Sequence, residues 1–358
     1  MTVLQVCAFG APRPGNFIAT LASLEWALKE RGIRTVYALA ETAKGKDWCN
    51  DICKRAKVYF IPVKHARILP ETYRQFKKIY SENDISIVHT HFELYDIPAT
   101  ITAPKDSAIF WHLHDPIKDN YNNAKLTRKL LYKLQYGVFG KKAKLLSVSK
   151  EHADFAVSLG FLKERVYYVP NGIDTNRISE SNCMEKDDVF LIFGWDVLRK
   201  GLDLAIEAEC KLPGKFRIIA VGQESCKEYL GRTPTKHVSF SYPVDDVNKF
   251  YSVCKAFLHV SRAEGLSYAL IEAIYAGLIV ICSDIPENQI AREFAGIRFV
   301  RSGESDDIRD AMQDVLDGKI TLSIEECKMN RSLIDNKYSL NAWLATIQSL
   351  YALREGEL

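Results

Sequence analysis

The chain has 358 residues, of which 47% are hydrophobic and 26% charged, and its net charge is +3. This composition excludes a disordered or collagen-like protein, and the length exceeds one ordinary hydrophobic core and fits two domains. The nine cysteines are odd in number and lack a paired spacing pattern, which excludes a complete disulfide framework and favours a reducing cytoplasm. No stretch approaches the ~20 apolar residues of a membrane span, so we expect any membrane contact to be peripheral.

Short apolar runs alternate with helical patterns along the chain, which is typical of parallel α/β proteins. In the first half, strands are expected at residues 3–9, 35–40, 57–62, 86–89, 108–112 and 144–149. A turn-rich break at 170–174 precedes a second series of strands. We therefore predict two Rossmann-like doubly wound parallel-sheet domains, residues 1–170 and 171–337, facing a central cleft. Residues 338–358 form a helical pattern that we expect to return to the first domain.

The segment Ser261 to Gly277 carries two carboxylates, Glu264 and Glu272, separated by seven residues. An apolar strand leads into it, and Ser267 is expected to be the N-cap of a helix that follows. The first amides of a helix lack intrahelical partners and the helix dipole favours an anion, so this turn can bind phosphate. The amides concerned are those of Gly265, Leu266, Ser267 and Tyr268. With hydroxyl acceptors on both sides, the segment predicts a nucleotide-sugar pocket; an ordinary loop and amphipathic helix is the alternative.

Several short segments resemble the motifs of one protein family, in the same order along the chain. They are His89-Thr90-His91-Phe92, Pro170-Asn171-Gly172-Ile173-Asp174, Arg199-Lys200-Gly201, Ser261-Arg262-Ala263-Glu264-Gly265 and the Glu264/Glu272 pair. Together they resemble the family 4 retaining glycosyltransferases of the GT-B fold, among them bacterial capsular and surface polysaccharide glycosyltransferases. The resemblance implies that a sugar is moved from a nucleotide-diphosphate sugar, which we expect to be a UDP-sugar, to a hydroxyl of a lipid-linked or growing surface polysaccharide.

The resemblance also assigns roles to residues of the second domain. Glu264 would contact the hydroxyls of the donor sugar, and Glu272 would hold the ribose. Arg199 and Lys200 match basic positions that neutralise the diphosphate, where fixed cations stabilise the leaving group without a metal or another cofactor. The absence of any Asp-x-Asp pair agrees with this interpretation. A solvated turn before a helix is the alternative for the two basic residues.

The sequence departs from its relatives after the first strand of the second domain. The family often has Gly-Arg-Leu there, and this chain has Gly194-Trp195-Asp196. Either Arg199 replaces the missing charge, or Lys200 and backbone amides hold the phosphate.

Three further residues of the first domain match family positions. Gly15 matches a glycine that lets the backbone approach the donor phosphate, although a plain turn would also explain it. His114 aligns with a histidine near the primary hydroxyl of the sugar; the alternative is a histidine hydrogen-bonded at a strand end. Because His89 and His91 alternate along a strand, we expect them to point to opposite sides of the sheet. Metal binding by both is then disfavoured, and His91 is the candidate on the acceptor side.

Between residues 116 and 150, nine basic residues stand against one acid, Asp119. Apolar residues at helical spacing accompany them, namely Leu126, Leu130, Leu131, Leu134 and Val138. This pattern predicts a basic amphipathic helix around Lys125 to Lys144 that binds an anionic membrane surface. Alternatively, the apolar stripe faces the core and the basic face is solvated. Nucleic acid is not expected as a partner, because no aromatic stacking platform accompanies the charge. We expect a cytoplasmic enzyme, peripheral at the inner face of the cell membrane.

Two other functions fit the same pattern. A nucleotide-sugar epimerase or hydrolase can share this fold, because fold does not fix function. A non-catalytic partner of another glycosyltransferase is the second, and the presence of Glu264, Glu272 and Lys200 argues against it.

Overall fold

The computed structural model describes residues 1–179, 186–244 and 246–352. It contains two compact units, and each is described by itself. Unit 1 comprises Met1–Gly172 and the C-terminal residues from Asn341, and unit 2 comprises Ile173–Leu340. The divisions lie close to residues 170 and 337, where the sequence places its domain boundaries.

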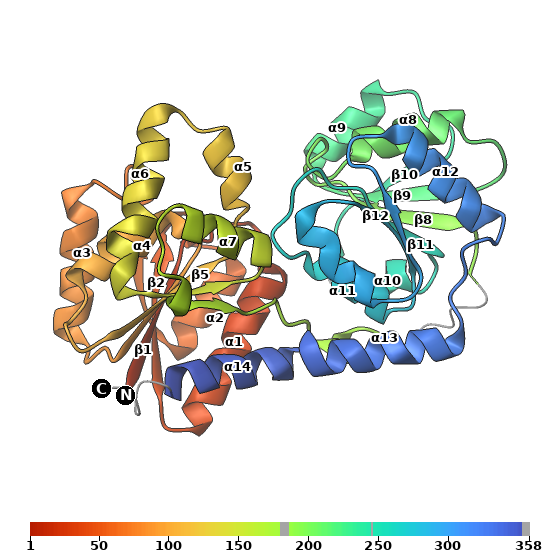
Figure 1. The fold of residues 1–358 in the computed structure, drawn as a ribbon. Helices are drawn as coiled ribbons and strands as arrows, with labels where there is room; N and C mark the ends of the chain where they lie inside the picture. The colour runs from red at the N-terminus through yellow and green to blue at the C-terminus, as the bar shows by residue number, and fades with distance from the viewer. Residues whose placement is uncertain (180–185, 245, 353–358) are drawn as a thin grey trace. The chain divides into compact units, whose positions relative to one another are not determined.

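Unit 1 contains a seven-stranded parallel sheet with the order β3-β2-β1-β4-β5-β6-β7 (Figure 1). Its strands are β1 (Thr2–Cys7), β2 (Arg34–Ala40), β3 (Lys57–Ile61), β4 (Ile87–His91), β5 (Ala108–Leu113), β6 (Lys144–Ser147) and β7 (Val166–Tyr168). Its helices before the unit boundary are α1 (Gly15–Glu30), α2 (Asp47–Arg55), α3 (Pro70–Glu82), α4 (Asp96–Thr102), α5 (Ile117–Asn122), α6 (Leu126–Gly137) and α7 (Lys150–Ser158). The strand order reverses direction after β1, as in a doubly wound sheet.

Unit 2 contains a six-stranded parallel sheet with the order β10-β9-β8-β11-β12-β13. The strands are β8 (Val189–Phe193), β9 (Arg217–Val221), β10 (Val238–Ser241), β11 (Ala256–His259), β12 (Ile279–Ser283) and β13 (Ile297–Val300). The helices are α8 (Leu202–Lys211), α9 (Glu224–Arg232), α10 (Asn248–Tyr251), α11 (Tyr268–Tyr275), α12 (Ser305–Leu316) and α13 (Ile324–Lys337). Together the two sheets confirm the predicted fold class of two Rossmann-like parallel-sheet domains.

Short 3-10 helices complete the secondary structure, at Glu41–Ala43, Glu93–Tyr95, Phe139–Lys142, Lys163–Arg165, Thr175–Arg177 and Pro286–Glu293. The central strands of both sheets are buried on both faces, as expected for parallel strands covered by helices. Among the described helices, none combines the length and the apolar character needed to cross a membrane.

The last helix, α14 (Leu340–Ala352), packs on unit 1. Its apolar side chains Trp343, Ile347, Leu350 and Tyr351 are buried. The Tyr351 hydroxyl bonds Gln5 on β1 and His89 on β4, and Figure 1 shows α14 beside α1. The helix of the expected segment 338–358 begins slightly later than residue 338, because Tyr338 is the C-cap of α13. Residues 353–358 of that segment lie outside the described residues.

Candidate functional site

The loop between β8 and α8 brings Arg199 and Lys200 to the end of the sheet. Its turn is closed by two backbone hydrogen bonds, from Lys200 N to Asp196 O at 2.8 Å and from Leu202 N to Val197 O at 2.9 Å. Gly201 has φ +73°, and a Cβ atom there would lie 2.2 Å from the Val260 carbonyl oxygen. Only glycine lets the loop pass this close to the end of β11.

The two basic residues meet the first carboxylate of the predicted pair. Lys200 Nζ lies 2.5 Å from one oxygen of Glu264, and Arg199 Nη1 lies 3.5 Å from the other. The Glu264 side chain is 6% exposed and that of Lys200 is 11% exposed, so this ion pair is nearly excluded from water. Two segments that are 64 residues apart in sequence thus form one charged cluster.

Burial acts differently on the two partners of this ion pair. Burial raises the pKa of Glu264, but Lys200, His259 and Arg199 together outweigh it and lower the pKa to about 2. For Lys200, burial lowers the pKa, and the attraction of Glu264 only partly offsets it. Each ion pair favours the charged forms, but Glu264 faces more than one cation while Lys200 also faces the like charge of Arg199. Glu264 is therefore ionised at neutral pH and can only accept hydrogen bonds.

Trp195, which stands where the family resemblance led us to expect an arginine, supports the two cations instead. The Arg199 guanidinium carbon lies 4.5 Å from the centroid of the Trp195 ring, and Lys200 Nζ lies 5.3 Å from it. Arg199 is also held by Asp196 at 3.1 Å and by the carbonyl of Ala263 at 3.3 Å. A cation over an indole face is stabilised by the ring quadrupole, so the tryptophan fixes the position of the charge without supplying one.

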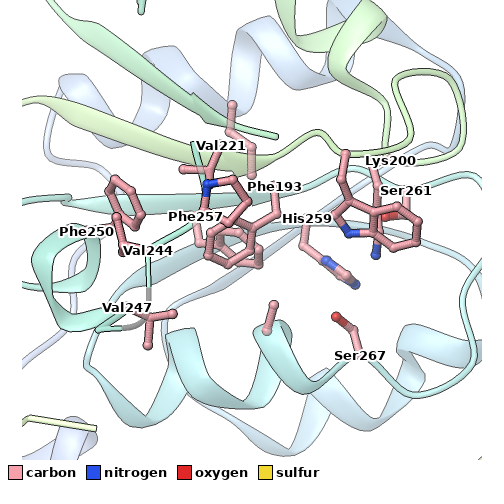
Figure 2. A pocket seen from close by; sticks show the side chains of 14 residues that line it. Phe193, Lys200, Val221, Val244, Val247, Phe250, Phe257, His259, Ser261 and Ser267 are labelled. Atoms are coloured by element: carbon pink, nitrogen blue, oxygen red, sulfur yellow. The ribbon is translucent and has the colours of Figure 1, made fainter. Parts of the chain in front are cut away.

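A pocket of unit 2 ends at this cluster, with a cavity volume of about 180 Å³. Figure 2 shows Val244, Val247 and Phe250 at one end and Lys200, Ser261, His259 and Ser267 at the other, with Phe193 and Phe257 between them. The pocket is therefore apolar at one end and polar and cationic at the other.

The helix after Glu264 begins as predicted, at Tyr268 with Ser267 as its N-cap. Within the described chain the Ser267 side chain makes no capping hydrogen bond, and it lines the pocket instead. Glu272 is buried one turn into α11 and accepts a hydrogen bond of 3.0 Å from the Tyr251 hydroxyl. Gly265, Leu266 and Ser267 form the turn between Glu264 and α11, and Tyr268 is the first residue of that helix, as the sequence predicts.

Sequence reasoning missed two residues around this pocket, Tyr251 and His259, and the role of a third, Trp195. Tyr251 positions Glu272 through a hydrogen bond. His259 lines the pocket, and its Nε2 lies 3.2 Å from Asn288 Oδ1. The Trp195 ring packs against the Arg199 guanidinium. Tyr251 ends the short helix α10, and His259 ends the apolar strand β11, so chain position alone was the available signal.

In unit 1 the prediction for His89 and His91 was wrong. Their ring centroids lie 4.2 Å apart, on the same side of the sheet. Side chains alternate between faces along a strand, so residues two positions apart share a face. His112 on the neighbouring strand β5 and His114, the residue just after that strand, are also two positions apart, with ring centroids 4.2 Å apart, and the four imidazoles form one group.

This group also bears on metal binding. One nitrogen from each of His89, His91 and His112 lies within 4.8 Å of the others. However, both nitrogens of His91 have hydrogen-bond partners, and the rings of His89 and His112 are stacked with planes only 5° apart. Lone pairs lie in the ring plane, so stacked rings do not direct them toward one common point. The arrangement fits a hydrogen-bonded group better than a ligand set.

Gly15 lies near this group. It is the first residue of α1 and has φ +56°, and a Cβ atom there would meet no described atom within 4 Å. Phe17, two residues further along α1, packs against His91 and His114 with centroid distances of 5.2 and 5.4 Å. The structure therefore brings Gly15, His91 and His114 into one region of unit 1, and Lys200, Arg199, Glu264, Glu272 and Ser267 into one region of unit 2.

The basic segment forms α5, α6 and a 3-10 helix rather than one continuous helix. In α6 the buried side chains are Tyr132, Gln135 and Tyr136. The apolar stripe faces outward, with Leu126 83% exposed, Leu130 59%, Leu134 42% and Val138 54%. The alternative in which this stripe faces the core is therefore wrong.

Two Rossmann-like units, one with an apolar pocket that ends in cations, are the architecture of a GT-B glycosyltransferase. The family model for Glycosyltransferase Family 4 matches residues 19–177, and that for Glycosyl transferases group 1 matches residues 174–339. The chain belongs to the family 4 glycosyltransferases.

Named relatives include the lipopolysaccharide glucosyltransferase WaaG of Escherichia coli K12, 29% identical over 41% of this chain and 45% of the relative. The capsular polysaccharide biosynthesis glycosyltransferase CapH of Staphylococcus aureus is 23% identical over 62% of this chain and 65% of its own. These matches thus span less than two thirds of the curated relatives. Among solved structures, Anabaena HepE in complex with UDP and glucose has a TM-score of 0.80 at 15% identity and covers 99% of this chain and 100% of its own, a likeness of fold.

Proposed function

We propose that this chain is a retaining glycosyltransferase that moves a sugar from a UDP-sugar to a hydroxyl of a lipid-linked or growing surface polysaccharide, without a metal. The observation that carries the proposal is the pocket of unit 2, which is apolar at one end and ends at the Lys200–Glu264 ion pair. The names of WaaG, CapH and the UDP-bound HepE support the reaction class and the donor.

A nucleoside diphosphate sugar has a flat base at one end and an anionic diphosphate further along, which matches a pocket that is apolar at one end and cationic at the other. The base is flat and fits between the side chains of Phe193, Val244 and Phe250. The diphosphate then reaches Lys200 and the amides at the start of α11, where a helix N-terminus favours an anion. The donor sugar is left beside Glu264, and the ribose beside Glu272.

The chemistry follows from the charges. When the bond between the anomeric carbon and the phosphate oxygen breaks, negative charge develops on the nucleoside diphosphate, and Lys200 and Arg199 stabilise it. Glu264 is ionised and accepts hydrogen bonds from sugar hydroxyls. The acceptor oxygen bonds the anomeric carbon from the side of the leaving group, and its proton passes to the departing phosphate oxygen. The protein then contributes position and charge rather than a covalent nucleophile.

Calorimetry with UDP, GDP and ADP tests the site. We expect UDP to bind most tightly, and Lys200→Met to weaken its binding more than Lys227→Met, a control at an exposed lysine of the same unit. Equal affinity of all three nucleotides in both variants would contradict the proposal.

The reaction class needs a second experiment. Incubation of a UDP-sugar with and without a glycan acceptor separates a transferase from an epimerase or hydrolase, which changes the donor without an acceptor. An NMR measurement of the anomeric configuration of the product tests retention, and activity in excess chelator tests independence from metal.

We also assign α6 to an anionic membrane surface, where a lipid-linked acceptor would be found. Its exposed residues Leu126, Leu130 and Leu134 recur every fourth position, and no acid occurs between residues 120 and 150. Apolar side chains flanked by lysines bind the lipid interface through burial and through attraction to anionic headgroups, at about 1 kcal/mol per well-placed basic residue.

Sedimentation with vesicles tests this assignment. Binding to vesicles that contain phosphatidylglycerol should exceed binding to pure phosphatidylcholine and fall with added salt. Leu130→Glu with Leu134→Glu should abolish it, whereas Ile68→Glu, at an exposed isoleucine elsewhere in unit 1, should leave it unchanged. Equal sedimentation of both variants would exclude α6 as the membrane contact.

A further inference from the structure

A continuous chain of hydrogen bonds runs through unit 1 from the C-terminal helix to His114. The Tyr351 hydroxyl lies 2.7 Å from His89 Nδ1 and 3.2 Å from Gln5 Nε2. Gln5 Oε1 lies 2.9 Å from His91 Nε2, and His91 Nδ1 lies 3.2 Å from His114 Nε2. All of these side chains except His114 are almost completely buried, so water cannot easily replace a missing partner.

The Gln5 amide fixes where each proton of this chain lies. Its oxygen can only accept, so His91 must carry a proton on Nε2. Burial lowers the pKa of His91, and it lowers that of His114 by more than a side-chain hydrogen bond with Asn171 raises it, so both rings are neutral and carry one proton each. His91 Nδ1 is then bare and accepts, so His114 must donate from Nε2. The same rule makes Tyr351 accept from Gln5 and donate to His89.

We propose that Gln5, held by Tyr351 of α14, is a positioning residue that keeps His114 in the tautomer with its proton on Nε2 and its Nδ1 bare. A bare Nδ1 accepts a hydrogen bond from a hydroxyl or an amide, whereas a protonated Nδ1 would donate one. Only the use of His114 toward a substrate hydroxyl rests on the proposed function; the tautomer is a property of the unliganded protein.

This chain of hydrogen bonds has one competing arrangement. If the Gln5 amide turned over, its nitrogen would donate to His91 Nε2 and every bond along the chain would reverse. His114 would then carry its proton on Nδ1. The orientation of one buried amide thus selects between two tautomers of a histidine that follows another strand, β5, and the partner of that amide is Tyr351.

Nitrogen NMR of histidine-labelled protein measures the tautomer directly. In the wild type at pH 7 we expect His114 to show a protonated Nε2 and a bare Nδ1. Gln5→Met removes the acceptor of His91, and His114 should then show a mixture of both tautomers; Tyr351→Phe should shift it in the same direction and change the His89 signals. Tyr80→Phe removes a hydroxyl that donates to the Ala99 carbonyl and takes no part in this chain of hydrogen bonds, so the histidine signals should stay unchanged.

A wild-type His114 with its proton on Nδ1, or one whose tautomer is the same in Gln5→Met, would overturn the proposal. The wild-type measurement decides even if a variant fails to fold. In a transfer assay, Gln5→Met should lower kcat/KM by about tenfold, the usual range for a residue that orients another. Its affinity for UDP should stay unchanged, because the nucleotide pocket lies in unit 2. If the wild-type protein transferred no sugar at all, the proposed function would be wrong, while the result for the tautomer would still hold.

Discussion

Unit 2 buries a carboxylate between two cations where β8 and β11 end, whereas unit 1 buries histidines and keeps them neutral where β4 and β5 end. In unit 2, Glu264 is ionised and contacts Lys200 and Arg199. In unit 1, burial lowers the pKa of His89 to about 3, and that of His91 also falls well below its ordinary value. A buried charge needs a partner of opposite sign, but a neutral imidazole needs only hydrogen bonds.

This difference indicates which kind of ligand each region can bind. A site that already holds fixed cations can receive a diphosphate with little rearrangement, because the charges are in place before the ligand arrives. A neutral hydrogen-bonded group can orient hydroxyls without attracting an anion. The two sheets share an architecture, and their polar residues adapt one to charge and the other to uncharged groups.

Among the changes that test this difference between the units, removal of the Glu264 charge should have the largest effect, a loss of transfer activity. Glu264→Gln keeps the shape but leaves Lys200 with a weaker partner, and it weakens the contact with sugar hydroxyls. We expect kcat/KM for the donor to fall by roughly 100-fold, as when one charge-stabilising group is removed from an active site. Release of UDP measures it. Glu293→Gln, at an exposed acid that pairs with Lys337, is the control and should retain full activity. Equal activity of the two variants would remove Glu264 from the site.

The fold and half of the site could be predicted from the sequence, for physical reasons. Periodic apolar runs specify strands locally, and Glu264 and Glu272 lie on one short segment whose geometry follows from a strand, a turn and a helix. The contact of Glu264 with Lys200 joins residues 64 positions apart, and only the resemblance to a family linked them.

Other features depend on packing that a linear pattern does not contain. The stacking of Arg199 on Trp195 depends on the path of a loop, and the chain from Tyr351 to His114 joins residues from opposite ends of the sequence. The outward direction of the α6 stripe was undecided because Tyr132 and Tyr136, on another face, provide the buried contacts. The error for His89 and His91 concerned strand geometry itself, and the alternation rule would have corrected it.

Acid should destabilise unit 1 at a higher pH than unit 2, and we expect the size of this effect to lie between those of the other two predictions. His89 has an ordinary pKa of 6.5 and a folded pKa of about 3, so between these values the unfolded chain binds a proton that the folded unit 1 does not. The four histidines therefore destabilise unit 1 as the pH drops below 6.5, and the two carboxyls of Asp96 and Asp115, whose pKa burial raises to about 7, offset only part of that loss. Glu264 has an ordinary pKa of 4.5 and a folded pKa of about 2, so its contribution to unit 2 is lost only in that lower window.

Hydrogen exchange of the strand amides at pH 7.0, 5.5 and 4.5 measures the difference. After correction for the intrinsic exchange rate, protection of β4 and β5 should decrease before that of β8 and β11. Unit 2 has one buried histidine of this kind, His259 with a pKa of about 4, against four in unit 1. Simultaneous loss of protection in both units would contradict the contrast.

Trp195→Leu should have the smallest effect and tests whether the cations of unit 2 need their support. The variant removes the ring beneath Arg199 and Lys200 but leaves the contacts of Arg199 with Asp196 and Ala263. A cation–π contact at a partly exposed site is worth about 0.5–1 kcal/mol, so UDP should bind roughly two- to fivefold more weakly by calorimetry. Trp195→Phe should restore part of the affinity, since it keeps an aromatic face. Trp26→Leu removes a comparable contact, with Lys29 Nζ 4.9 Å from the ring centroid, in unit 1 and should not change UDP binding. If Trp195→Leu binds UDP as tightly as the wild type, Asp196 and Glu264 hold the cations without the ring.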